Sequence, residues 1–196
     1  ERPVEAGRLA ELLALHGIEV HRLTADTVAA NVKHEKGSLV IRMDQPYSRL
    51  ADMFLDRQYY NPNDTPPYDD TGWTMTALRN LKSTRVTDAG ILNAPMAPVG
   101  DNPYPEGRVV GSGDVFLVPH NSDRILATLR FRLKDVPIQA ATAAFEHGGR
   151  KYPAGSWIIE GARHRRALEA AAADTGVTAY AVSAKPAVAS VPVSVP

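Results

Sequence analysis

The feature that most constrains the fold of this chain is an internal repeat. Shifting the sequence by 118 residues aligns residues 15–50 with residues 133–168 without a gap, and eight of the 36 aligned pairs are identical. These pairs are Leu15/Leu133, Thr24/Thr142, Ala25/Ala143, Lys33/Lys151, Gly37/Gly155, Ser38/Ser156, Ile41/Ile159 and Leu50/Leu168. Self-similarity at a fixed spacing is typical of a chain that folds the same supersecondary unit more than once. The alternative is an accidental similarity between two α/β segments.

Within each half, the apolar spacing predicts a helix, a strand, a turn, a strand and a second helix. A helix over 3–15 carries leucines at helical spacing and ends at Gly17, because glycine readily adopts the left-handed conformation that closes a helix. The second strand of each half begins at the repeated Gly-Ser pair. Further predicted elements are strands at 18–21 and 38–43, a helix at 47–59, a strand at 115–118, a helix at 124–133, strands at 136–140 and 156–159, a helix at 162–173 and a last strand at 177–182.

These elements predict an α/β fold with a mostly parallel central sheet and helices on both faces, built from a duplicated helix–strand–strand–helix unit. The two pseudo-repeats span about 3–60 and 114–175, and a connection rich in proline and glycine at 91–113 joins them. We expect both in a single domain at 1–185. Residues 186–196 alternate Pro, Val, Ala and Ser, a composition that predicts a linker.

The composition argues against several function classes. Lys and Arg together number 22, as do Asp and Glu, so the chain lacks the basic excess that nucleic acid or an anionic membrane attracts. There is no cysteine, which removes disulfides and thiol nucleophiles. No apolar run approaches the roughly 20 residues that span a bilayer, so we expect no membrane insertion. The chain begins at Glu1 without Met, and we expect a fragment or a mature product.

Two strand-to-helix junctions are the candidate ligand-binding sites. Such loops place free N–H groups at a helix start, where α/β proteins often bind anions and small ligands. Helix capping explains the same polar residues equally simply, with Ser122 or Asp123 as the cap of the second helix. The candidate ligand-binding residues are Asp44, Tyr47 and Arg49 at the first junction, and His120, Asn121 and Ser122 at the second. We expect no catalytic residue in either loop.

Two further patterns suggest chemistry that we do not expect here. His16 and Glu19 have the HxxE spacing of zinc ligands, with His120 as a distant third. Gly17 separates a helix end from a strand start, however, so His16 is better placed to contact the last carbonyls of its own helix. Asp69 and Asp70 are paired acids that could serve glycoside hydrolysis, although adjacent carboxylates in a loop often diverge. We therefore expect no metal site and no bound cofactor in this chain.

Several segments resemble large bacterial proteins of the zinc carboxypeptidase (carboxypeptidase A-like) family. One is Gly-Ser-Leu-Val-Ile-Arg-Met-Asp-Gln-Pro-Tyr-Ser-Arg-Leu-Ala-Asp at 37–52, in which the Asp-Gln-Pro-Tyr-Ser-Arg run at 44–49 is specific, and another is Leu-His-Gly-Ile-Glu-Val-His-Arg at 15–22. The likeness continues at 56–64, 67–74, 130–135 and 152–159, and so covers nearly the whole chain.

The resemblance implies a region downstream of the metallopeptidase domain, with an organisation like that of class I glutamine amidotransferases. Zinc and peptide hydrolysis would belong to the catalytic domain, and glutaminase chemistry would need a cysteine that this chain lacks. The expected function is a non-catalytic accessory domain, secreted or periplasmic, whose partner is the neighbouring catalytic domain of the same polypeptide. It would meet peptide substrates only indirectly. The alternative is a small-ligand or carbohydrate binding module that uses the two junction loops.

Overall fold

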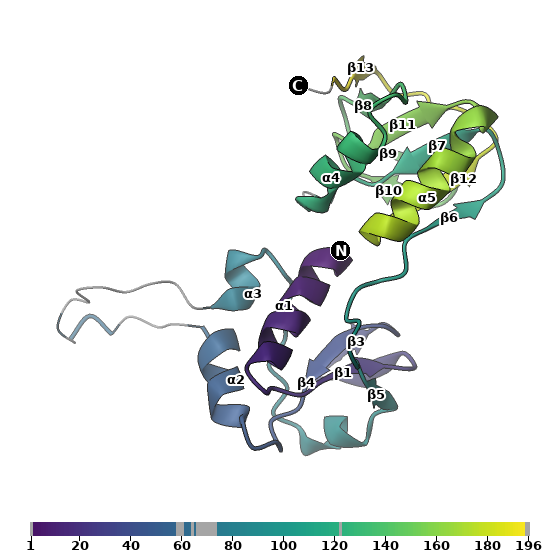
Figure 1. Cartoon of the computed structure of the whole chain (residues 1–196). Helices are drawn as coiled ribbons and strands as arrows, with labels where there is room; N and C mark the ends of the chain where they lie inside the picture. The colour runs from purple at the N-terminus through teal and green to yellow at the C-terminus, as the bar shows by residue number, and fades with distance from the viewer. Residues whose placement is uncertain (1, 58–60, 64, 66–73, 122, 195–196) are drawn as a thin grey trace. The chain divides into compact units, whose positions relative to one another are not determined.

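The computed structural model describes residues 2–57, 61–63, 65, 74–121 and 123–194, and the chain divides into two compact units (Figure 1). The N-terminal unit comprises Glu5–Pro103, and the C-terminal unit comprises Tyr104–Pro196 together with Glu1–Val4. This division places the two pseudo-repeats in different units, and the single domain expected at 1–185 stays a prediction. Among the described residues, no helix is both long and apolar enough to cross a membrane.

The N-terminal unit is a three-stranded antiparallel sheet with helices packed on it. Its strand order is β4-β1-β5, and its core joins the apolar faces of α1 and α2 to Ile18 and Val20. The elements are α1 (Pro3–Leu15), β1 (Val20–Leu23), β2 (Thr27–Ala29), β3 (Val32–His34), β4 (Leu39–Ile41), α2 (Ser48–Leu55), α3 (Met75–Leu78), the 3₁₀ helix η1 (Ala89–Asn93) and β5 (Met96–Pro98). Strands β2 and β3 form a separate hairpin.

Helix α1 ends where the sequence predicts, at Gly17. The N–H of Ile18 donates to the carbonyl of Leu13 at 3.0 Å, and the N–H of Gly17 donates to that of Ala14 at 2.9 Å. This is a Schellman motif, which requires a left-handed residue, and Gly17 has φ of 74°. Leu13 and Ile18, the two apolar residues that close such a motif, are both buried. The motif thereby directs the chain from the helix into β1.

The C-terminal unit contains a larger, six-stranded sheet in the order β13-β8-β11-β7-β12-β6, in which only β12 and β6 are parallel. A separate hairpin consists of β9 and β10. The elements are β6 (Arg108–Gly111), β7 (Val115–Val118), α4 (Ile125–Arg132), β8 (Gln139–Ala141), β9 (Phe145–His147), β10 (Arg150–Tyr152), β11 (Trp157–Glu160), the 3₁₀ helix η2 (Ala162–His164), α5 (Arg165–Thr175), β12 (Thr178–Val182) and β13 (Ser190–Pro192).

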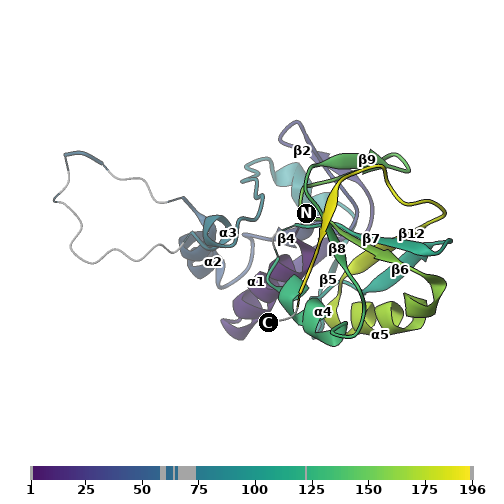
Figure 2. The same cartoon turned by 90° about the horizontal axis from the view of Figure 1, so that it is seen from above.

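The two faces of this sheet are covered by different structures. Phe116 and Ile159 belong to one core cluster with the apolar residues of α4 and α5. Leu117 and Ile158, which alternate with them along β7 and β11, belong to another cluster with Tyr152 of the hairpin. Figure 2 shows α4 and α5 on one side of the sheet and β9 on the other. Strand β7 is therefore buried on both faces.

The prediction of a mostly parallel central sheet with helices on both faces is wrong. The chain forms one mixed sheet with a single parallel pair and small antiparallel sheets, and the helices of the C-terminal unit lie on one face. Each repeat is a helix, four strands and a helix, because a hairpin occupies the connection that the sequence analysis treats as a turn. Parallel strands need a crossover connection, usually a helix, and no helix lies between β1 and β4 or between β8 and β11.

The same elements recur in the two units at the 118-residue spacing. Hairpin strands β2 and β3 coincide with β9 and β10 after the shift, and β4 coincides with the first three residues of β11. The backbone hydrogen bonds recur as well: Leu23 N–H donates to Ser38 O at 2.9 Å, and Ala141 N–H donates to Ser156 O at 2.9 Å. The repeated Gly-Ser pair therefore has the same place beside the first strand in both units.

The C-terminal tail takes part in the sheet of its own unit. The sequence predicts a linker at 186–196, whereas Ser190–Pro192 forms β13 and pairs with β8. This pairing has a counterpart in the N-terminal unit, where β5 pairs with β1 in the corresponding register. The Pro-, Val- and Ala-rich composition of the tail thus supplies an edge strand, a position in which proline is tolerated.

Candidate functional site

The first junction loop, between β4 and α2, is held together by its own polar side chains. Arg42 and Asp44 form a two-armed ion pair, with Nε to Oδ1 at 2.9 Å and Nη2 to Oδ2 at 2.6 Å. The hydrogen bond from Arg42 holds the pKa of Asp44 below its usual value, and that from Asp44 raises the pKa of Arg42. The Asp44 carboxylate, a candidate ligand-binding group, is therefore already paired within the loop.

Gln45 is the residue of this loop that the sequence analysis misses. Its side chain is buried and makes three hydrogen bonds. Its Oε1 accepts from the N–H of Glu19 at 2.7 Å, and its Nε2 donates to the carbonyls of Glu19 at 3.0 Å and Arg42 at 2.6 Å. Gln45 thereby ties the loop to the start of β1. The Asp-Gln-Pro-Tyr run contains this glutamine, but a linear pattern does not reveal the strand that it contacts.

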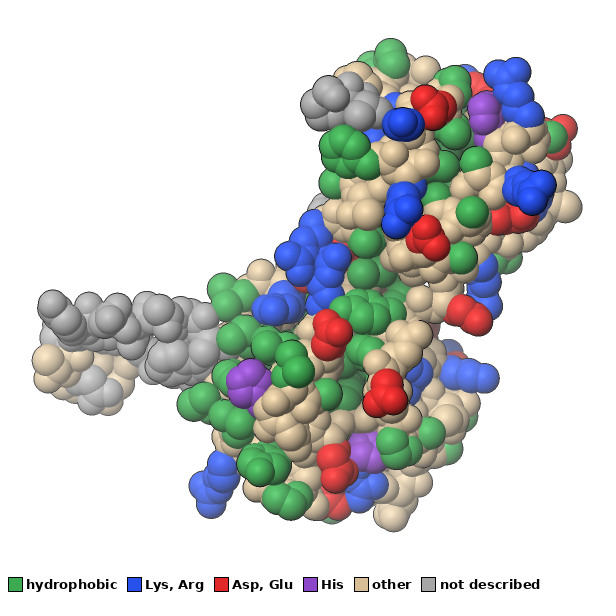
Figure 3. Space-filling model, viewed as in Figure 1, with side chains coloured by type: hydrophobic (Ala, Val, Ile, Leu, Met, Phe, Trp, Pro, Cys, Tyr) green, Lys and Arg blue, Asp and Glu red, His purple; other side chains and the backbone are tan. Residues whose placement is uncertain are grey.

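Tyr47 and Arg49, the other two candidates of the first loop, are exposed. The ring of Tyr47 lies against Gly17, where an added Cβ would stand 3.1 Å from its Cε2. Tyr47 is the N-cap residue of α2 and makes no capping hydrogen bond through its side chain. Figure 3 shows apolar side chains on the face of the N-terminal unit that carries α1 and α2.

The second junction loop, between β7 and α4, is also organised by internal hydrogen bonds. Asn121 Oδ1 accepts from the N–H of Asp123 at 3.0 Å, and Asp123 Oδ1 accepts from the N–H of Ile125 at 3.0 Å. The capping interpretation is therefore confirmed at Asp123, which is buried at the start of α4. The carbonyl of Asn121 accepts from Arg2 Nε at 2.9 Å. Ser122 lies outside the described residues.

His120 contacts the repeated Gly-Ser pair. Its N–H donates to Ser156 Oγ at 3.1 Å, and its ring packs against Gly155, where an added Cβ would stand 3.1 Å from Cγ. Ser156 is fully buried, and its Oγ also donates to the carbonyl of Pro153 at 2.7 Å. Ser156 thus links the second junction loop to the turn that precedes β11. The identity of Ser38 and Ser156 in the repeat is the signal that could have identified it.

His16 contacts its own helix and a neighbouring aromatic ring. His16 Nδ1 lies 2.9 Å from the carbonyl of Leu12, which confirms the predicted contact with its own helix, and its ring meets Phe54 edge-on with centroids 5.1 Å apart. The third proposed ligand, His120, belongs to the other unit. Among the residues that the structure describes, no three His, Asp or Glu side chains gather as metal ligands.

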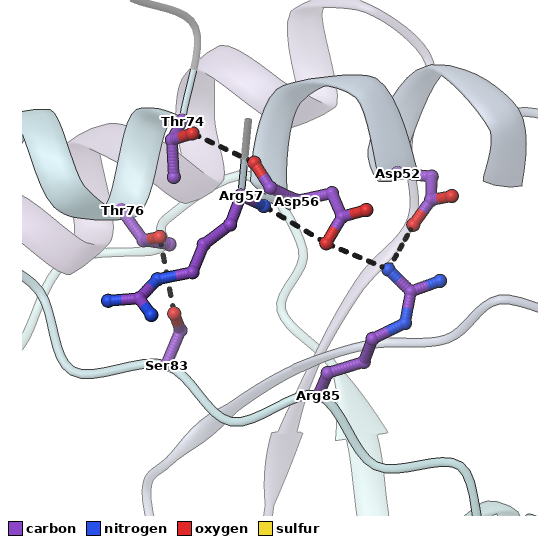
Figure 4. Close-up of polar contacts among 7 residues, drawn as sticks. All are labelled: Asp52, Asp56, Arg57, Thr74, Thr76, Ser83 and Arg85. Carbon is purple, nitrogen blue, oxygen red and sulfur yellow. Dashed lines mark hydrogen bonds and ion pairs between the residues drawn. The ribbon is translucent and has the colours of Figure 1, made fainter. Parts of the chain in front are cut away.

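A polar cluster near the end of α2 is a second feature that the sequence analysis misses (Figure 4). Arg85 Nη1 lies 2.7 Å from Asp52 Oδ1 and 3.1 Å from Asp56 Oδ1, and these two acids raise the pKa of Arg85. The hydroxyl of Thr74 donates to the carbonyl of Asp56 at 2.8 Å. Acids at a helix C-terminus oppose the helix dipole, and Arg85 offsets this. The spacing of Asp52 and Asp56, one helical turn apart, was the available signal.

The candidate residues therefore fall into two groups that belong to different units. Asp44, Tyr47 and Arg49 lie in the N-terminal unit, and His120 and Asn121 lie in the C-terminal unit. The proposed acid pair Asp69–Asp70 lies outside the described residues.

The fold and these loops define a strand-rich chain of two related units whose junction loops are bound to their own sheets. Compared with known proteins, the chain matches no family model, no curated protein and no solved structure.

Proposed function

We propose that this chain is a non-catalytic accessory region of a zinc carboxypeptidase-like protein. The observation that carries the proposal concerns residues 37–52, the segment of the resemblance that contains the specific run at 44–49. Its polar side chains are engaged in building the N-terminal unit: Gln45 binds β1 by three hydrogen bonds, and Arg42 pairs with Asp44. Because these side chains are used to build the fold, the segment favours a structural role, in which this chain positions a neighbouring domain. Zinc and peptide hydrolysis would then belong to that domain.

The residues of this chain do not fit the zinc role that the HxxE spacing suggests. His16 is bound to the carbonyl of Leu12, and the backbone N–H and carbonyl of Glu19 are both bound to Gln45. Among the residues that the structure describes, no third His, Asp or Glu side chain gathers with these two, so they offer no complete ligand set for zinc. The ligand-binding alternative has less support, because the carboxylate of Asp44 and the side-chain carbonyl of Asn121 are both occupied by intramolecular partners.

The first test is an activity assay on the purified chain. Release of C-terminal residues from a panel of peptides is measured with and without added zinc, beside an authentic zinc carboxypeptidase as the positive control. We expect no zinc-dependent release and no change on His16→Ala or Glu19→Gln. Zinc-dependent cleavage that is abolished by either substitution would overturn the proposal.

The second test asks whether the first junction loop has a structural role. Gln45→Ala removes a buried side chain with three hydrogen bonds, and we expect a loss of about 1–3 kcal/mol in the free energy of unfolding. Arg49→Ala, in the same loop but exposed, is the matched control and should change stability by less than about 0.5 kcal/mol. Equal effects of the two substitutions would remove the observation on which the proposal rests.

A further inference from the structure

Strands β4 and β11 have equivalent positions in the two units but different neighbours. Each pairs with the first strand of its repeat: Val40 lies opposite His21 in β1, and Ile158 lies opposite Gln139 in β8. These pairs coincide after the 118-residue shift. Strand β11 also pairs with β7 on its other side, whereas β4 is at the edge of its sheet. As far as the structure describes the N-terminal unit, its sheet ends at β4, whereas the sheet of the C-terminal unit continues beyond β11.

The hydrogen-bonding groups of this edge can be assigned from the strand geometry. Leu23 N–H donates to Ser38 O, so every second residue of β1 bonds toward β4, and His21 bonds with Val40. The N–H and C=O groups of Leu39 and Ile41 therefore point outward. Among the described residues, no strand pairs with them.

In the C-terminal unit, the equivalent residues are fully paired. Trp157 and Ile159 lie opposite Val118 and Phe116 of β7 in an antiparallel register. All three residues of β4 are apolar and only half-buried, whereas their counterparts in β11 are buried. Natural edge strands are usually protected by charges, proline or bulges, and the Leu-Val-Ile sequence of β4 has none of these. Its sequence is that of an interior strand.

We propose that the outer edge of β4 binds an extended apolar strand of the same polypeptide, located N-terminal to α1, in the place that β7 holds in the C-terminal unit. We infer an apolar strand because β7, which holds the equivalent place, has four apolar residues that are all buried. Strand β7 precedes α4 in the chain, and the 118-residue shift puts its counterpart ahead of Glu1. The strand would run antiparallel to β4 and form main-chain bonds with Leu39 and Ile41. The duplication alone carries this inference, which is independent of the peptidase proposal.

The test uses amide hydrogen exchange on two versions of the chain. In the first, residues 1–196 are used as they are. In the second, the sequence of β7 with its flanks (residues 113–120) is joined ahead of Glu1 through a short Gly-Ser linker. We expect the amides of Leu39 and Ile41 to exchange at least about tenfold more slowly in the joined chain, while the amide of Val40, already bonded to β1, changes little.

A matched control carries Phe116→Pro only in the joined copy, which removes a donor and should abolish the added protection. Unchanged exchange in the joined chain would overturn the proposal, as would slow exchange of Leu39 and Ile41 in the monomeric chain of residues 1–196. Light scattering identifies another contrary outcome, in which a second copy of the chain protects the edge. The source of the strand is tested with the natural polypeptide extended ahead of Glu1, where the same two amides must be protected.

Discussion

The two units repeat one arrangement but complete it differently. In the C-terminal unit, β7, β12 and β6 extend the repeated strands into six, and the hairpin covers the face opposite the helices. In the N-terminal unit the sheet stops at β4 after three strands. The repeat therefore specifies a minimal core, and the residues outside the repeat decide how much of that core is buried.

The hairpins show the same contrast at the level of side chains. In the C-terminal unit, the rings of Phe145 and Tyr152 stack with centroids 4.9 Å apart, and Tyr152 also meets Tyr180 edge-on at 6.4 Å. The equivalent positions in the N-terminal unit are Thr27 and His34, and neighbouring Val28 is 73% exposed. One hairpin packs on its sheet through aromatic rings, and the other keeps the strand pairing without that packing. We expect the C-terminal unit to be the more stable of the two.

The largest expected effect uses an identical pair of the repeat, Ile159 and Ile41. Ile159→Ala should cost about 2–5 kcal/mol, because the side chain is fully buried and its loss leaves a cavity. Ile41→Ala should cost clearly less, about 1–2 kcal/mol, because Ile41 is only half-buried. Urea denaturation followed by two-dimensional NMR reports each unit separately. Equal losses at the two positions would mean that the β4 edge is as well covered as β11.

The next prediction compares the repeated serines. Ser156→Ala leaves the N–H of His120 without its buried partner and removes one of the two hydrogen bonds to the carbonyl of Pro153, so it should destabilise the C-terminal unit by about 1–3 kcal/mol. Ser38→Ala, at a half-buried position, should change the N-terminal unit by less than about 0.5 kcal/mol. Thermal unfolding of both variants checks the difference. A Ser38→Ala loss as large as that of Ser156→Ala would show that the two turns depend on the hydroxyl alike.

The sequence was a good guide to what the repeat contains and a poor guide to how its strands pair. The helix end at Gly17 and the 118-residue spacing depend on local signals, and both are found in the structure. Strand direction depends on partners distant in sequence, which apolar spacing does not encode. The Gly148–Gly149 pair could have predicted the second hairpin, because a type I′ turn favours two glycines. In the first repeat the same turn is formed by Ala30–Asn31, a pair that does not indicate a hairpin as clearly.

The candidate sites had a similar outcome. A strand is followed by a helix at both predicted junctions. However, the polarity of a residue in the sequence does not show whether its side chain faces solvent or bonds to another residue of the chain. Asp44 is paired with Arg42 only two residues away, and Asn121 bonds within its own turn. Gln45 and Arg85 were missed because their partners come from other segments: Glu19 for the first, and Asp52 for the second. Such contacts exist only once the fold brings the segments together.

A smaller effect is expected from exchanging the turn residues of the two hairpins. Ala30 has φ of 51°, and its counterpart Gly148 has φ of 57°. A residue with a Cβ pays a steric penalty in this region that glycine avoids. Ala30→Gly should stabilise the N-terminal unit by up to about 1 kcal/mol, and Gly148→Ala should destabilise the C-terminal unit by about 1 kcal/mol. Urea midpoints measure both. Effects of the same sign would show that the turns are not equivalent.

The smallest effect concerns pH. We expect acid to reduce the stability of the N-terminal unit and alkali to reduce that of the C-terminal unit. Hydrogen bonds from Lys33 to Asp26 and from Arg42 to Asp44 lower the pKa of both carboxyls. Their stabilisation is therefore present above the unfolded pKa of about 3.9 and is lost as the pH falls through the lower folded values. Both pairs are exposed, so the loss should be small. The repeat has Ala144 and Ala162 at these positions, so only the N-terminal unit contains the two pairs.

The C-terminal unit has the opposite dependence through Tyr152. Burial raises the pKa of its hydroxyl above 10, so the stabilisation is present at lower pH and is lost as the pH rises beyond the unfolded value of about 10. The measurement is the urea midpoint of each unit from pH 3 to pH 11. Asp26→Asn should flatten the acid side for the N-terminal unit, and Tyr152→Phe should flatten the alkaline side for the C-terminal unit. If each substitution instead altered the pH profile of the other unit, the two units would be unfolding as one body, and their differences in packing could not be compared separately.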